Sequence, residues 1–231
     1  MQRLPLPEDV PAGVEVWQLA LNLQMPVSEA DTSLLSEDER VRALSFRQHA
    51  DRVRSIATRA ALRRTLALRT RSRPEALRFA ENRYGKPYLE EEGGLEFNVS
   101  HAGCFALIAL STNGQVGVDI EYRNRRIDAR ELGGYVFSQL EHASGLKTNE
   151  AFIERWVAKE SVLKALGVGI SEHLQAISIL PDDAGGYRVS HNHPEWLGIK
   201  VWSIEAPDCY AAALAVKNRD SALSALKPYQ S

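Results

Sequence analysis

The sequence has few of the features that mark membrane, disulfide-stapled or metal-cluster proteins. Its 231 residues include only two cysteines, and the net charge is −2. Cys104 and Cys209 lie too far apart to define a zinc motif or a disulfide framework. No apolar run approaches the roughly 20 residues of a membrane-spanning helix, and residues 1–13 predict no signal peptide. These absences favour a reduced, cytoplasmic protein without a membrane partner.

Several nucleotide and hydrolase motifs are also missing. The chain has no Walker loop, no G-x-G-x-x-G and no G-x-S-x-G elbow. The serine and histidine at 100–101 are neighbours in the sequence and face opposite ways on a strand, so they form no catalytic dyad. For residues 191–193, His-Asn-His, a polar turn between strands is favoured over a metal site.

A strong local charge stands out against the near-neutral total. Residues 40–78 contain twelve arginines and two acids, a local net charge of +10, so the rest of the chain is acidic. Such a segment favours an anionic partner: a nucleic acid, a phosphate-rich cofactor or an acidic protein. A solvated helical face is the alternative.

The apolar patterning predicts an α+β protein. Helices are expected after a capping box at 36–39, over 51–68 and over 150–166, the last ending at Gly167. Strands are expected over 14–23, 95–99, 105–110, 116–120, 176–180, 197–204 and 210–216. A faint repeat, Cys-Phe-Ala at 104–106 and Cys-Tyr-Ala at 209–211, is what two related halves with a break near 111–115 would leave, and a chance match of three residues is the alternative.

Two carboxylates alternate with apolar residues on one expected strand. Asp119 and Glu121 are two positions apart, so both point to one face. Like charges on one face repel unless a cation lies between them, and Mg²⁺ is held by carboxylates together with substrate phosphates. The alternative is the solvent side of a half-buried strand.

The helix expected over 150–166 adds a third carboxylate. Phe152 and Trp156 begin an apolar stripe that continues at i+4 spacing to Glu160 and Lys164. A charge on an inward face needs a partner, because desolvation alone costs several kcal/mol. Glu160 can therefore complete a metal site with Asp119 and Glu121, while Lys164 neutralises a phosphate. A surface Glu–Lys pair is the alternative.

Four motifs in order resemble the phosphopantetheinyl transferases of the longer, surfactin-synthetase-activating type. They are Tyr-Gly-Lys-Pro at 84–87, Asn-Val-Ser-His at 98–101, Gly-Val-Asp-Ile-Glu at 117–121 and Trp-x-x-Lys-Glu-x-x-x-Lys at 156–164. The resemblance implies two pseudo-symmetric α/β halves, residues 1–113 and 114–231, with the active site between them. It also implies transfer of phosphopantetheine from coenzyme A to a serine of an apo acyl or peptidyl carrier protein, with release of 3′,5′-ADP by a monomer.

The resemblance also implies roles for individual residues. The metal ligands for Mg²⁺, with Mn²⁺ as an alternative, are Asp119, Glu121 and Glu160. The coenzyme A contacts are Arg42, Arg54, Lys86, Pro87, Ser100, His101, Lys159 and Lys164. Of these site residues, Glu160, Lys164 and His101 are assigned to catalysis, Glu160 as the candidate base.

Two positions depart from the family pattern, and three rival functions remain. Val157 replaces a small polar residue, and Glu39 stands where some members have a basic phosphate contact, which Arg40 or Arg47 could replace. The basic segment is expected to hold coenzyme A phosphates and attract an acidic carrier. The rivals are a metal-dependent hydrolase of nucleotides or coenzyme A, a degenerate coenzyme A binder and a nucleic-acid-binding module. The carboxylates argue against the last, so no nucleic acid is expected as a partner.

Overall fold

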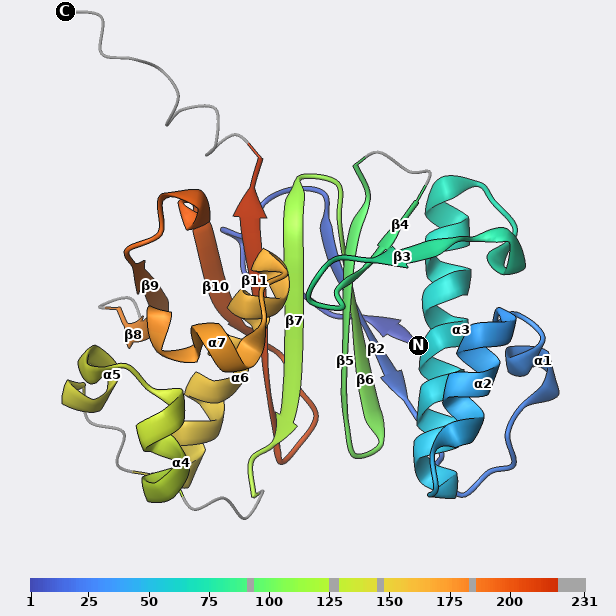
Figure 1. Ribbon diagram of the computed structural model, residues 1–231, viewed down its shortest axis with the longest axis horizontal. Coiled ribbons are helices and arrows are strands. Elements are labelled where there is room, and N and C mark those ends of the chain that lie inside the picture. Colours follow the sequence, from blue (N-terminus) through green and yellow to red (C-terminus); the bar gives the residue numbers. More distant parts are fainter. Residues whose placement is uncertain (91–93, 125–128, 145–147, 183–185, 220–231) are drawn as a thin grey trace, which may run out of the picture.

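The chain folds into two small sheets, each carrying one long helix (Figure 1). The computed structural model describes residues 1–90, 94–124, 129–144, 148–182 and 186–219. The elements before residue 113 are β1 (Gln2–Arg3), β2 (Val14–Ala20), α1 (Glu29–Thr32), α2 (Glu37–Ser45), α3 (His49–Thr70), η1 (Pro74–Ala76), β3 (Phe79–Glu81), β4 (Pro87–Leu89), β5 (Glu96–Ala102) and β6 (Phe105–Ser111).

The remaining elements build the second sheet and its surroundings. They are β7 (Gly114–Tyr122), α4 (Ala129–Val136), α5 (Gln139–Ala143), α6 (Asn149–Leu166), α7 (Ile170–His173), η2 (Leu174–Ala176), β8 (Ile177–Pro181), β9 (Tyr187–His191), η3 (Pro194–Trp196), β10 (Ile199–Ile204) and β11 (Tyr210–Asn218). The first sheet has the order β1-β2-β6-β5 and the second β10-β11-β7, while β3-β4 and β8-β9 form separate pairs.

The two sheets repeat one topology, which confirms the expected α+β fold of two similar halves. The series β2, α3, β5, β6 corresponds to β7, α6, β10, β11, and in each the last strand pairs antiparallel with the other two. The Cys104 carbonyl accepts a hydrogen bond from the amide after β2, at 2.8 Å, and the Cys209 carbonyl accepts one from the amide after β7, also at 2.8 Å. The faint sequence repeat therefore marks equivalent corners of the two halves.

Helix α6 packs directly on β7 because one strand residue has no side chain. A Cβ on Gly117 would lie 2.0 Å from the Ser161 carbonyl oxygen and 2.3 Å from the Ala165 amide nitrogen. The helix begins at a Thr148 cap and ends at Gly167, whose φ of +66° suits glycine. Close packing of α6 on β7 brings the inward face of the helix to the carboxylates of the strand.

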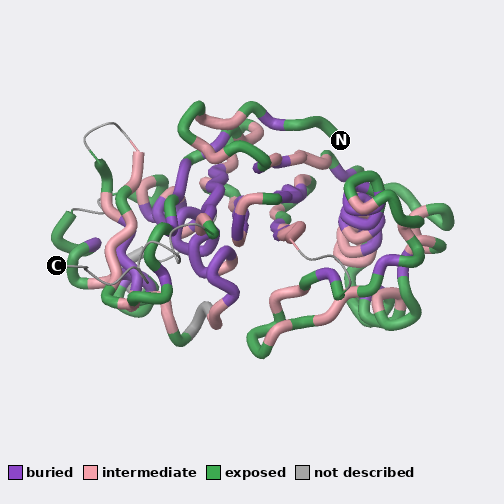
Figure 2. The backbone as a smooth tube through the Cα atoms, turned by 90° about the horizontal axis from the view of Figure 1, so that it is seen from above, coloured by how far each residue is buried: buried purple, intermediate pink, exposed green. Residues whose placement is uncertain are grey.

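The two sheets meet where β5 and β7 lie side by side (Figure 1), and there a side chain of β5 bonds to the backbone of β7. The Asn98 Oδ1 atom of β5 accepts a hydrogen bond from the Val118 amide of β7 at 2.9 Å. Buried residues continue through both sheets and the inner faces of α3 and α6, and the exposed residues lie on the outer helices and loops (Figure 2). The region between the two sheets is therefore supported on both sides by closely packed, buried side chains.

Some elements differ from the sequence-based expectations. The long helices and main strands occur where they are expected, with ends shifted by a few residues. Strand β9 was not expected, and His191, assigned to a turn, is its last residue. The short helices α4, α5 and α7 were also missed, since one or two helical turns carry too little periodicity to detect. Within the described residues, no helix combines the length and apolar character needed to cross a membrane.

Candidate active site

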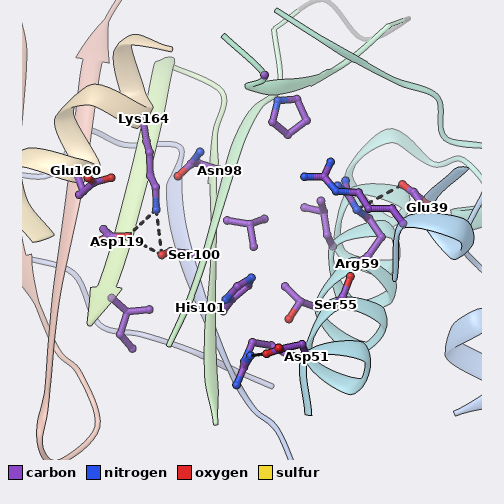
Figure 3. A pocket seen from close by; sticks show the side chains of 18 of the residues that line it. Glu39, Asp51, Ser55, Arg59, Asn98, Ser100, His101, Asp119, Glu160 and Lys164 are labelled. Carbon is purple, nitrogen blue, oxygen red and sulfur yellow. Dashed lines mark hydrogen bonds and ion pairs between the residues drawn. The ribbon is translucent and has the colours of Figure 1, made fainter. Parts of the chain in front are cut away.

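A cavity of about 580 Å³ lies between the two halves of the molecule. One wall is formed by α2, α3 and the β3–β4 turn, and the other by β5, β7 and α6 (Figure 3). The sequence-predicted residues that line it are Arg42, Arg54, Pro87, Ser100, His101, Asp119, Glu121, Glu160 and Lys164. Folding thus brings together residues from 42 to 164 as a single site.

The deepest part of this site is a hydrogen-bonded group on β5, β7 and α6. Lys164 Nζ lies 2.6 Å from Asp119 Oδ1 and 3.1 Å from Ser100 Oγ, and Ser100 Oγ donates to the same Asp119 oxygen at 2.6 Å (Figure 3). Asp119 is only 4% exposed and Glu160 5%. Of the two charges predicted on the inward face of α6, Glu160 is therefore buried and Lys164 half-buried beside the strand carboxylates, rather than paired on the surface.

The carboxylates fit a hard divalent cation by their chemistry. Asp119 Oδ2 is buried and has no hydrogen-bond partner among the described residues. Asp119, Glu121 and Glu160 all face the cavity and offer only oxygen donors, which Mg²⁺ prefers. As these side chains are placed, no three His, Cys, Asp or Glu residues in the described ranges are gathered closely enough to hold a metal. The donor set fits the ion, and ligation requires the side chains to converge further.

Burial and neighbouring charges alter the acidity of two groups in the pocket. Burial raises the pKa of the Glu160 carboxyl to about 7, and the charges of Asp119 and Glu121 act in the same direction. Burial also lowers the pKa of the His101 imidazole, with the cations Arg54 and Lys164 contributing. Near neutral pH, His101 is thus biased toward its neutral form, and Glu160 is placed to exchange a proton.

The structure does not bring Lys159 to the pocket, so its assignment as a coenzyme A contact is corrected. Its side chain is fully buried on the other side of α6, and Nζ lies 2.5 Å from Glu141 Oε2. Nζ also donates to the Val136 and Leu174 carbonyls at 2.9 and 2.8 Å. Lys159 therefore anchors α6 to α5 and the segments around it.

Lys86 is likewise turned away from the cavity, in contrast to its assigned ligand role. Its Nζ donates to the Val116 carbonyl at 3.2 Å and the Ala165 carbonyl at 3.0 Å. The Asn82 side chain adds a hydrogen bond to the Gly167 carbonyl at 2.8 Å. The β3–β4 hairpin thereby holds the end of α6 and the edge of β7, and only Pro87 of the predicted pair reaches the pocket.

We expect Lys86 to make stability depend on pH in a direction set by its burial. Burial lowers its pKa to about 8, so the unfolded chain binds more protons between about pH 8 and 10.5. The contribution of Lys86 to the free energy of unfolding should rise across that interval, by up to about 3 kcal/mol. Urea titrations of wild type and Lys86→Met at pH 7 and 10 test this. A difference between the proteins that stays constant with pH would contradict it.

The structure adds pocket residues that sequence reasoning did not single out. Arg59 and Thr58 of α3 line the cavity together with Glu39 of α2. The capping box is confirmed, and its Glu39 Oε2 also accepts from Arg63 Nε at 2.8 Å. Ser55, which also lines the cavity, lies four residues before Arg59 on the same face of α3. This spacing was the available signal, but with twelve arginines in one segment the sequence did not distinguish Arg59 from the others.

The basic segment is not an open cationic surface. Several of its arginines are neutralised by acidic side chains, most of them outside the segment, and Arg63 is fully buried. The paired arginines are Arg42, Arg54, Arg59, Arg63, Arg64, Arg69 and Arg73. Much of the local excess charge therefore serves the packing of α3, which weakens the argument for a nucleic-acid partner.

Duplicated halves with a cavity that joins carboxylates, a lysine and arginines define an enzyme that handles a phosphate-bearing substrate. Residues 115–215 match the model of the 4′-phosphopantetheinyl transferase superfamily, and residues 26–113 match that of the 4′-phosphopantetheinyl transferase N-terminal region. The chain belongs to the 4′-phosphopantetheinyl transferase superfamily.

Individual relatives agree with this membership. A Synechocystis sp. member is 35% identical over 165 residues, which are 68% of this chain and 66% of that protein. The 4′-phosphopantetheinyl transferase HetI of Nostoc sp. is 32% identical over 174 residues, 72% of this chain and 73% of HetI. The 4′-phosphopantetheinyl transferase Sfp of Bacillus subtilis is 26% identical over 162 residues, 68% of this chain and 71% of Sfp. The resemblance carried by the four motifs is confirmed, and with it the class of enzyme, a 4′-phosphopantetheinyl transferase.

Proposed function

We propose that this chain transfers the phosphopantetheine arm of coenzyme A to a serine hydroxyl of an apo acyl or peptidyl carrier protein, with Mg²⁺ as its metal. The observation that carries the proposal is the buried cluster of Asp119, Lys164 and Ser100 opposite the arginine-bearing wall of one cavity. The lysine and the arginines that line this cavity supply positive charges suited to a substrate with a pyrophosphate and a further phosphate. The two cysteines are free thiols, as expected in the reducing cytoplasm.

Asp119, Glu121 and Glu160 are the residues that would hold Mg²⁺. When bound, the ion neutralises pyrophosphate charge and favours in-line displacement. Lys164 and Ser100, which already contact each other at 3.1 Å, are placed to bind phosphate oxygens by charge-assisted and neutral hydrogen bonds. His101, on the next position of β5, donates to the departing 3′,5′-ADP and stabilises its developing charge.

Glu160 is proposed as the base. The carrier serine oxygen forms a bond to the pantetheine-side phosphorus, while the bond from that phosphorus to the oxygen of 3′,5′-ADP breaks. The serine proton moves to a carboxylate oxygen of Glu160, directly or through a water molecule. Without a bound metal ion, burial and the charges of Asp119 and Glu121 raise the pKa of Glu160 to about 7, so in that state its carboxylate is a stronger base than an ordinary glutamate.

Intact-mass measurement of a carrier protein tests the proposal. We expect apo carrier incubated with enzyme, coenzyme A and Mg²⁺ to gain one phosphopantetheine group, and 3′,5′-ADP to appear in equal amount. EDTA should abolish the gain, and added Mg²⁺ should restore it. A carrier whose serine is replaced by alanine provides the matched control.

Three outcomes would contradict the proposal. Release of 3′,5′-ADP without any carrier would instead identify a hydrolase. Binding of coenzyme A without modification of fatty-acid, polyketide or peptide-synthetase carriers would identify a degenerate binder. Full activity in EDTA would show that the reaction needs no divalent metal ion, and the three carboxylates would then have another role.

A further inference from the structure

A short segment at the start of the chain contacts both sheets. β1 pairs antiparallel with β2 of the first sheet, and the Leu4 amide donates to the Val16 carbonyl at 2.9 Å. Asp9 Oδ2, a few residues later, accepts a hydrogen bond from Trp202 Nε1 of β10, in the second sheet, at 2.8 Å. In Figure 2 the chain runs from N along the upper edge of the view, past the strands in the middle of the molecule. Residues 2–10, the crossing segment, therefore connect the two halves.

The crossing segment packs on a core that the two sheets share. Leu4 is only 4% exposed, and Leu6 and Val10 pack against the same cluster of buried residues. This cluster takes side chains from β2 and β6 of the first sheet and from β7, β10 and β11 of the second. The other apolar clusters of the described ranges each stay within one half. Because the segment buries apolar side chains against both sheets at once, it favours one arrangement of the halves.

The tryptophan that anchors the segment lies in a row of residues that leads to the junction of the sheets. Trp202 is opposite Leu214 in the β10–β11 register, and Leu214 is opposite Val118 in the β11–β7 register. The Val118 amide donates to Asn98 Oδ1 of β5, the contact between the sheets described above. The crossing segment is therefore attached to the row of the second sheet that meets the first sheet.

This attachment and the cavity lie on opposite faces of the second sheet. Trp202 and Val118 belong to the shared core, whereas Asp119, the next residue of β7, lines the cavity. Successive residues of a strand point to opposite faces. A rotation of one half about the junction therefore changes the separation of the cavity walls on one face and the span of the crossing segment on the other.

Two prolines make the crossing segment a stiff spacer. Pro5 and Pro7 lie between its two attachments, and each has φ fixed at about −65°. Proline-rich segments are extended and semi-rigid. The Val10 amide also donates to the Pro7 carbonyl at 3.1 Å, which closes the turn that contains Asp9. The distance between the two attachments is therefore set by the segment itself.

We propose that the crossing segment fixes the angle between the two halves and that Asp9, acting through Trp202, is a positioning residue for the binding of coenzyme A. This inference rests on the proposed function, because it takes coenzyme A as the ligand that contacts both walls of the cavity. Trp202 is 8% exposed, and a buried indole N–H needs an acceptor. Without that acceptor, the halves populate angles at which only one wall contacts the ligand. The apparent affinity then falls with the fraction of molecules that have the binding angle.

Double electron–electron resonance tests the angle directly, through distances between spin labels on the two halves. Labels are attached at the exposed positions of Leu68→Cys on α3 and Arg188→Cys on β9, in a protein that also carries Cys104→Ser and Cys209→Ser. We expect Asp9→Ala to broaden the distance distribution of the ligand-free protein, and coenzyme A to narrow it again. Asp9→Asn keeps an oxygen acceptor and should retain the original distribution.

Isothermal titration calorimetry measures the consequence for binding. We expect Asp9→Ala to weaken coenzyme A binding about 2- to 10-fold, the range for loss of one hydrogen bond, and Asp9→Asn to bind as wild type does. Turnover of a carrier protein at saturating coenzyme A should fall by less than about twofold, because the bound ligand itself holds the walls together. The KM for coenzyme A should therefore rise while kcat is retained.

Two controls separate positioning from a general loss of stability. Ile179→Val shortens a fully buried side chain of β8 outside the shared core. It should lower stability by an amount similar to Asp9→Ala and leave both distances and affinity unchanged. Trp202→Phe removes the indole donor, so Asp9→Ala should cause no further loss of affinity in that background.

Wild-type distances or wild-type affinity in Asp9→Ala would overturn the inference. So would an Ile179→Val protein that binds as weakly as Asp9→Ala, or an Asp9→Ala effect that persists in full beside Trp202→Phe. The distance measurement on the ligand-free protein requires neither coenzyme A nor a carrier. A protein whose distances and affinity respond to Asp9→Ala as expected but which modifies no carrier would therefore count against the proposed transfer alone.

Discussion

Replacing Asp119 with asparagine is expected to lower turnover by about 10³-fold, which corresponds to about 4 kcal/mol of transition-state stabilisation. The reason is positional. Asp119 is the buried carboxylate that both Lys164 and Ser100 contact, and its second oxygen is available to a metal. Asparagine keeps the shape of the side chain but removes its charge. Rates of carrier modification at saturating coenzyme A and Mg²⁺ provide the measurement.

The loss should concern catalysis rather than binding of the substrate. In EDTA, Asp119→Asn should bind coenzyme A as well as wild type or better, because a negative charge has left a pocket that receives phosphates. Glu160→Gln should also lose most activity, and the double variant should lose little more than either single one, since the carboxylates act as a unit. Asp208→Asn, an exposed position outside the cavity, serves as the matched control. Weakened metal-free binding with normal turnover would contradict this assignment.

Lys159→Ala is expected to destabilise the protein by about 3–5 kcal/mol, the usual cost of leaving one member of a buried ion pair alone. Lys159 and Glu141 are both fully buried, and Glu141 also accepts from the Ile179 amide at 3.0 Å. Truncating the lysine leaves the Glu141 carboxylate buried without its cation, and it removes the hydrogen-bond donor of the Val136 and Leu174 carbonyls. Urea unfolding monitored by circular dichroism measures the change.

The double variant Lys159→Met with Glu141→Gln separates a structural role from a ligand contact. It removes both charges while keeping similar volumes, so it should recover part of the lost stability. Affinity for coenzyme A, measured where each variant is fully folded, should stay within about twofold of wild type. The reason is that the Lys159 side chain does not line the cavity and contacts Glu141 instead. A stable Lys159→Ala protein with weakened coenzyme A binding would contradict the structural role and indicate that Lys159 contacts coenzyme A.

Much of the catalytic wall could be predicted because its residues follow local periodicity. Asp119 and Glu121 share a face through the two-residue repeat of a strand, and Glu160 and Lys164 through the four-residue spacing of a helix. Both placements are confirmed by the cavity that these side chains line. The cysteine repeat also fits duplicated halves. Each half has one such corner, at which the cysteine carbonyl accepts a backbone hydrogen bond.

The roles of the lysines and arginines were harder to predict from the sequence, because each role depends on the partner that the fold places beside the side chain. Lys159 adjoins Glu160 in the sequence, yet a turn of about 100° per residue on the helix points it at Glu141. Lys86 belongs to a motif associated with ligand binding, but its ammonium holds two carbonyls of the other half. No pattern local to these lysines predicts those partners.

The sequence by itself determined the family, the two-half α+β fold and the carboxylates of the site, because periodicity and motif spacing are local properties of the chain. Only the tertiary structure decided which cations face the cavity. Arg59 remains available there while Arg54 and Arg63 are engaged by Asp51 and Glu39. The physical reason is that a buried charge is stable only beside a partner, and those partners come from segments that the fold, rather than the sequence order, brings together.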